Sequence, residues 1–125
     1  MTGRYIDTGA YLAFRRSVGG SADAQARFVR DFVALWRERA DRLTDNLDRR
    51  DLIAADITLL SIRSSSTMIG AVVLDAICGL IHTAVDRGDL EAARVHLERF
   101  REVGEATCGE LTERYRSEFG VRLTG

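Results

Sequence analysis

Apolar residues recur at steps of three and four along four long segments of the chain, which is the spacing of amphipathic helices. Polar residues that favour helix starts precede three of these segments: Ser21, Asp51 and Asp89. Glycines mark several of the boundaries, and the chain holds no proline. The predicted helices span residues 22–46, 52–69, 74–85 and about 90–118, and a shorter one precedes them at about 7–17.

Each predicted helix carries one apolar stripe that is expected to face a common core. The stripe of the first long helix has one wider gap, at Arg39. In chain order the four stripes comprise Phe28, Phe32, Leu35, Trp36, Leu43 and Leu47; then Leu52, Ala55, Leu59, Ile62, Ser66 and Ile69; then Leu74, Ile77, Cys78, Ile81 and Val85; and finally Leu90, Ala93, Leu97, Phe100, Thr107, Leu111 and Tyr115.

The connections between these helices are short. The breaks at Arg49-Arg50 and at Gly88 leave room only for neighbours that run antiparallel. The sequence shows no alternating strand pattern and no internal repeat. It therefore predicts an all-α fold, an antiparallel four-helix bundle with a short N-terminal helix, in which residues 1–125 form a single domain.

Composition narrows the function classes. Eighteen basic and nineteen acidic side chains give a net charge of −1, which argues against a nucleic-acid binder that relies on bulk positive charge. All eighteen basic residues are arginine, so lysine chemistry is excluded. The two cysteines, Cys78 and Cys108, are too few for a disulfide scaffold and fall on or beside apolar stripes, where small buried side chains are expected.

The stretch from Met68 to Val85 is largely apolar over eighteen residues. It contains Asp75, and a carboxylate inside a membrane helix costs roughly 2.5–3.5 kcal/mol. A buried helix hairpin is the expected form of this stretch. The first nine residues lack the apolar core of a signal peptide, so a cytoplasmic location with reduced cysteines is expected.

Standard chemical motifs are missing from the sequence. It has no glycine-rich phosphate loop and no His-Glu-x-x-His motif, and neither histidine follows a glutamate by three residues. We therefore expect no metal site and no cofactor. Histidine chemistry is confined to His82 and His96, and His96 is expected on the solvated side of the last helix.

An unusual hydroxyl-rich segment, Leu60 to Ala71, resembles the helix of histidine-phosphotransfer (HPt) domains that reads His-x-Leu-Lys-Gly-Ser and ends in Gly-Ala. The segment falls on that pattern without gaps. Cys78 and the turn Arg87–Ala93 match the family's helix hairpin and its entry to the last helix, and the runs Val18–Ser21 and Phe28–Trp36 resemble its first long helix. The resemblance spans about residues 7–115 and implies a signalling protein of a two-component phosphorelay, not an enzyme.

The resemblance also shows a departure at the residue that carries the family's chemistry. Leu60 stands where the family has its phosphoacceptor histidine, and Ser64 stands where it has glycine. Arg63 keeps the positive charge that the family usually places on lysine. Because leucine has no nitrogen to phosphorylate, the resemblance implies a degenerate member that cannot run the usual relay at this position.

His82 is the substitute phosphoacceptor that the sequence offers. Leu60 precedes Ala71 by eleven residues and His82 follows it by eleven, so in an antiparallel hairpin both lie at one level. A neutral imidazole there could accept a phosphoryl group if a ring nitrogen faced solvent. The alternative reading is a half-buried packing residue at the edge of the stripe.

The helical wheel places Leu60 about 100° from the buried Leu59, on the exposed side. Ile53 and Ile57 share that side and form an apolar ridge with Leu60, which Ser64 and Thr67 continue; Arg63 lies beside it. An exposed apolar ridge is a candidate interface. These residues are the candidate partner-binding set, and no catalytic residue is assigned.

Three functions follow as hypotheses. The first is a pseudo-phosphotransfer module that binds a response-regulator receiver domain or a histidine kinase. The second is an active phosphocarrier that uses His82. The third is a dimerisation module that pairs two copies through the ridge. No nucleic acid and no membrane are expected as partners.

Overall fold

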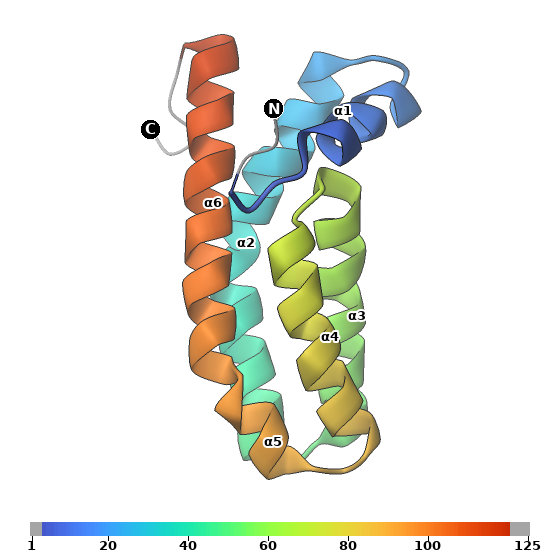
Figure 1. Ribbon diagram of the computed structural model, residues 1–125, viewed down its shortest axis with the longest axis vertical. Helices are drawn as coiled ribbons and strands as arrows, with labels where there is room; N and C mark the ends of the chain where they lie inside the picture. Colours follow the sequence, from blue (N-terminus) through green and yellow to red (C-terminus); the bar gives the residue numbers. More distant parts are fainter. Residues whose placement is uncertain (1–3, 121–125) are drawn as a thin grey trace.

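A computed structural model describes residues 4–120, and these residues form helices without strands. The predicted all-α bundle with a short N-terminal helix is confirmed. Figure 1 shows α2 and α6 side by side, with the α3–α4 hairpin packed against them. The helices are α1 (Thr8–Ser17), α2 (Ala22–Asp48), α3 (Leu52–Ile69), α4 (Val72–Asp86), α5 (Leu90–Val95) and α6 (Leu97–Phe119).

Side-chain caps set the start of four helices, as the sequence predicts for three of them. Each capping oxygen accepts a hydrogen bond from a backbone N–H three residues later, which satisfies one of the free donors of the first turn. The donor–acceptor distances are close to 3 Å. The pairs are Asp7 with Ala10 (3.1 Å), Ser21 with Ala24 (3.1 Å), Asp51 with Ala54 (3.0 Å) and Asp89 with Ala92 (3.0 Å).

The buried face of α2 follows a regular three- and four-residue step: Val29, Phe32, Trp36, Ala40, Leu43 and Leu47. Ala40 fills the gap that the sequence leaves at Arg39. Leu35, which was expected in this stripe, is 39% exposed, and Phe28 is only partly buried. The expectation for Leu35 is wrong because its neighbour Trp36 occupies the core position at this turn, and Leu35 lies about 100° around the helix from it.

The last predicted helix is divided. The backbone at His96 has φ −88° and ψ −6°, and its N–H bonds to the carbonyl of Ala93, three residues back, which ends α5 before α6 begins. The break lets α5 turn toward α4 and α2 at the end of the bundle (Figure 1). His96 lies at this break and is half-buried, so its expected place on the solvated side of a continuous helix is wrong.

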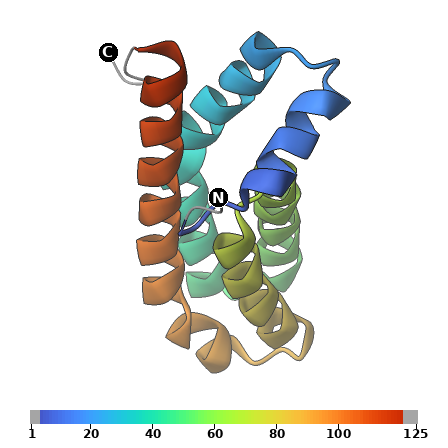
Figure 2. The same cartoon turned by 45° about the horizontal axis from the view of Figure 1, so that its top comes forward.

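The N-terminal segment closes the end of the bundle where α3 turns into α4 (Figure 2). The N–H of Asp7 donates to the carbonyl of Gly70 (2.8 Å), and Glu110 of α6 accepts from the backbone N–H groups of Tyr5 (2.8 Å) and Ile6 (3.0 Å). Ile6 is fully buried. The segment therefore ties α6 to the hairpin and places α1 across this end.

The apolar stretch from Met68 to Val85 is not one helix, because Gly70 and Ala71 separate α3 from α4. Within the described residues, α3 is long and apolar enough by length and composition to cross a membrane, with a mean hydropathy of 1.2. The core helix of a bundle passes the same test. A third of the residues of α3 are buried in this bundle, as expected for a helix that packs one face against a core.

Both thiols lie in the core, as predicted. Cys78 is fully buried and Cys108 is 8% exposed, and neither forms a disulfide. Burial raises the pKa of each thiol to about 12, because the charged thiolate loses its hydration.

The contact between Trp36 and Gly104 yields a first prediction. A methyl group at residue 104 would overlap the indole ring, which also packs on Phe100 at 5.0 Å between ring centroids. We expect Gly104→Ala to lower the free energy of unfolding by about 1–2 kcal/mol, since overpacking outweighs the better helix propensity of alanine. Gly109→Ala, in the same helix with open space around it, should raise it by up to about 1 kcal/mol. Urea unfolding followed by circular dichroism measures both. Equal effects of the two substitutions would contradict the contact.

The raised thiol pKa values predict a pH dependence. The ordinary thiol pKa of 9.0 holds in the unfolded chain, and the folded values are about 12, so only the unfolded chain ionises as the pH passes 9. Stability should be flat below pH 9 and should fall above it, by about 1 kcal/mol per thiol at pH 10. Urea unfolding at pH 8 and pH 10 tests this, with a Cys78→Ala/Cys108→Ala variant as control. The control should lose less stability between the two pH values, and an unchanged loss would refute the assignment.

Candidate functional site

Three apolar side chains project from the outer face of α3 in the order Ile53, Ile57 and Leu60. They are 78%, 64% and 49% exposed, respectively. Their spacing of four and three residues keeps them on one side of the helix, opposite Leu59 and Ile62, which are fully buried. The structure thus exposes the ridge that the sequence pattern predicts.

An open pocket of about 500 Å³ adjoins the ridge between α3 and α4. Four of the six candidate partner-binding residues line it, so the structure brings the end of the ridge and the arginine together. Met68 and Asp75, which sequence reasoning did not assign to the site, complete the wall. The lining residues are Leu60, Arg63, Ser64, Thr67, Met68 and Asp75.

Arg63 is fixed across the groove by a partner on α4. Its Nε donates to Oδ1 of Asp75 at 2.9 Å, and this hydrogen bond raises the pKa of Arg63 above its ordinary value. The guanidinium passes over Gly79, where an added Cβ would lie 3.5 Å from Nη2. A methyl group there would be in ordinary van der Waals contact with the guanidinium, so Arg63 packs closely over this part of α4.

His82 of α4 is held on both sides of its ring. Its Nε2 contacts a carboxylate oxygen of Asp56 on α3, and its Nδ1 lies 3.4 Å from Nη1 of Arg63. A guanidinium only donates, so Nδ1 is the accepting nitrogen and the proton of a neutral ring lies on Nε2, toward Asp56. The side chain is 17% exposed. A second carboxylate, that of Asp86, lies 3.8 Å from Nε2.

The counting argument places His82 at the level of Leu60, and the structure agrees to within a turn. Asp56 and Arg63, the two α3 residues that contact the ring, precede and follow Leu60 by four and three residues. Asp56 and Asp75 were missed because each lies on the helix that faces its partner, His82 or Arg63, and no local motif joins them. Asp86 follows His82 by four residues on the same helix, and this spacing was a signal that could have found it. The same counting, applied to His82 with a tolerance of one turn, would have found Asp56 and Arg63 as its neighbours.

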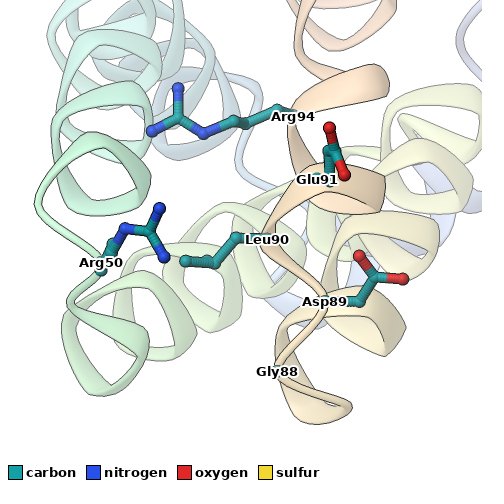
Figure 3. Close-up of a pocket in the computed structure, with 6 residues that line it drawn as sticks. All are labelled: Arg50, Gly88, Asp89, Leu90, Glu91 and Arg94. Atoms are coloured by element: carbon teal, nitrogen blue, oxygen red, sulfur yellow. The ribbon is translucent and has the colours of Figure 1, made fainter.

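A second pocket of about 460 Å³ lies at the other end of the bundle, between the α2–α3 and α4–α5 connections. Figure 3 shows Arg50 in the α2–α3 connection and Leu90, the first residue of α5, facing it. Its charged groups are of both signs and several are already engaged: Asp89 caps α5, and Arg94 pairs with Asp48 at 2.9 Å. We assign no function to this pocket.

Comparison of the sequence with protein-family models and with curated proteins finds no match. Solved structures do match. Histidine-containing phosphotransfer protein B (HptB) from Pseudomonas aeruginosa PAO1 superposes with a TM-score of 0.81 at 20% sequence identity, over 92% of this chain and 97% of that one. The histidine-containing phosphotransfer protein ZmHP2 from maize gives a TM-score of 0.57 at 18% identity, over 88% and 86% of the two chains.

These likenesses extend over nearly the whole of each chain, so they concern the complete helical arrangement and not one hairpin. They agree with the family resemblance that the segment from Leu60 to Ala71 suggests. The chain has the fold of the histidine-containing phosphotransfer proteins.

Proposed function

We propose that this chain is a phosphotransfer-like signalling protein of a two-component phosphorelay that binds without carrying phosphate. Its partner is a response-regulator receiver domain or a histidine kinase, it acts in the cytoplasm, and it is not an enzyme. One observation carries the proposal: Leu60, which the sequence resemblance places at the phosphoacceptor position, is a half-exposed apolar side chain at the end of an exposed apolar ridge.

The ridge and the pocket together suit a docking surface. Ile53, Ile57 and Leu60 offer apolar area, and the pocket beside them holds one arginine. Burying apolar side chains supplies affinity, while a charge at the edge favours an acidic partner and fixes its orientation. Arg63 is the group that would meet the acidic pocket of a receiver domain.

The active-carrier alternative, which uses His82, is weaker. A phosphoryl acceptor needs a ring nitrogen with a free lone pair and an open approach. In this structure Nδ1 faces Arg63, Nε2 faces the carboxylate of Asp56, and the side chain is 17% exposed. Transfer to His82 would first have to break one of these contacts.

The docking proposal predicts a loss of binding when the ridge is charged. We expect Leu60→Glu to weaken binding of the cognate receiver domain at least tenfold. Burial of the exposed half of the leucine contributes about 0.7–1.5 kcal/mol, a carboxylate in its place adds a desolvation cost, and a tenfold change is about 1.4 kcal/mol. Leu12→Glu is the matched control: Leu12 is 42% exposed against 49% for Leu60, but lies on α1. Titration calorimetry against the purified receiver domains and kinases of the source organism measures both variants.

Equal binding by the two variants would contradict the assignment of the surface. Sedimentation of the free protein separates the dimer alternative. A dimer that Leu60→Glu dissociates, together with no binding of any receiver or kinase, would favour self-association.

Phosphoryl transfer gives the fourth prediction. Incubated with a phosphorylated receiver domain, the chain should take up no acid-labile label, whereas Leu60→His, which places an imidazole at a half-exposed position, should acquire it. Autoradiography after acid and alkali treatment distinguishes phosphohistidine from other linkages. Label on the unaltered chain that vanishes in His82→Gln would establish the carrier alternative, and label that survives in His82→Gln would refute both.

A further inference from the structure

Two carboxylates from different helices converge on one imidazole beside the ridge. His82 and Asp86 lie four residues apart on α4, and Asp56 faces them from α3. One ligand atom from each of the three residues lies within 4.8 Å of the other two. The donor set is mixed, one nitrogen and two oxygens, and it joins neighbouring turns of two helices.

The charge of this cluster is unbalanced. Among residues 4–120, Asp56 and Asp86 form no ion pair with any arginine, although the chain has eighteen. The nearest guanidinium, that of Arg63, pairs with Asp75 and reaches only the far side of the histidine ring, 3.4 Å from Nδ1. Two carboxylates thus share one imidazole as their partner, and a cation would balance them.

The donor set selects the class of ion. Hard cations such as Mg²⁺ and Ca²⁺ prefer oxygen ligands alone, whereas Zn²⁺ and similar transition metals bind imidazole together with carboxylates. Ligand atoms around tetrahedral Zn²⁺ lie about 3.3 Å apart. The 3.8 Å between Asp86 and Nε2 is close to this spacing, and the Asp86 side chain, which is 66% exposed, is free to rotate. The carboxylate of Asp56 contacts Nε2 more closely than this, so it has to draw back when an ion replaces the proton between them. Both cysteines are buried and protonated, so neither thiol competes.

We propose that Asp56, His82 and Asp86 bind one divalent transition-metal ion of the zinc class, with solvent in the remaining coordination position. The sequence predicts no such site, because Asp56 and His82 stand 26 residues apart and match no ligand motif. The ion would join α3 to α4 beside the ridge. The proposal does not depend on what the ridge binds.

Arg63 opposes the ion in a way that can be measured. Metal on Nε2 puts the proton of the neutral ring on Nδ1, where the arginine also presents a donor. Binding therefore breaks the contact between Arg63 and His82 but leaves the hydrogen bond to Asp75 intact. Removing the guanidinium should tighten metal binding, whereas removal of a residue that merely supports the fold would not.

Titration calorimetry of the full-length, chelator-treated protein with ZnCl₂ tests the proposal. We expect one ion per chain, at least tenfold weaker binding for Asp86→Asn, no binding for His82→Gln, and several-fold tighter binding for Arg63→Met. His96→Gln is the matched control, because His96 is the other histidine and has no carboxylate within reach of its ring in the described chain. It should bind as the unaltered protein does.

Substitution with Co²⁺ gives a second readout, since the visible absorption of a tetrahedral site should appear in the unaltered chain and disappear in His82→Gln. Asp86 is largely exposed, so we expect Asp86→Asn to stay folded. If His82→Gln fails to fold, the Zn²⁺ affinity of Asp86→Asn tests the site. The absence of saturable Zn²⁺ binding would overturn the site. So would binding that His96→Gln abolishes or that Asp86→Asn leaves unchanged.

Discussion

The register of α3 against α4 is the constraint on which the candidate site depends, and the turn at Gly70 sets it. Gly70 ends α3 in a left-handed conformation (φ 76°), and the N–H of Ala71 returns to the carbonyl of Ser66 at 2.8 Å. An added Cβ at this position would meet the carbonyl oxygen of Asp7 at 2.8 Å. Glycine is therefore required both by the turn and by the N-terminal segment that packs over it. A shift of one residue here would separate every polar pair between the two helices.

That register produces a continuous line of polar contacts along the seam of the hairpin. Asp75, Arg63, His82 and Asp56 follow one another, each in contact with the next. Because the line engages both ring nitrogens of His82, this imidazole offers no free nitrogen in the structure. What remains on the outside at this level is Leu60. This arrangement supports our proposal of a surface that binds a partner without accepting a phosphoryl group.

The sequence predicts the bundle well because periodicity reports burial over many residues at once. Single positions are less certain: Leu35 and Trp36 are adjacent in the predicted α2 stripe, and only packing decides that the tryptophan lies inside and the leucine outside. The overlap of Trp36 with the space above Gly104 depends on how closely α2 approaches α6, which no local pattern encodes. The division at His96 also has no proline or glycine to mark it.

The site shows the same limit. The ridge of Ile53, Ile57 and Leu60 follows from helical spacing alone, since all three lie on one element. The partners of Arg63 and His82 lie on the facing helix, so they depend on register and on the length of each side chain. Counting residues outward from the α3–α4 turn locates these partners only to within one helical turn. In the sequence, Asp75 indicates only that the apolar stretch around it is not a membrane helix. In the structure, its carboxylate holds Arg63.

The energies of the ridge limit how a partner can bind. Burying the area that Ile53, Ile57 and Leu60 still expose contributes about 3–6 kcal/mol in total to the free energy of binding. Association costs about 4–15 kcal/mol, and a micromolar complex needs about 8 kcal/mol of net free energy. The ridge alone therefore does not hold a partner, and the pocket around Arg63 must contribute. Asp75 already occupies Nε of Arg63 and His82 faces Nη1, so the group most open to a partner carboxylate is Nη2, which donates to no residue between 4 and 120. Affinity for an acidic partner then depends on the hydrogen bond from Arg63 to Asp75, because it fixes where that free group points.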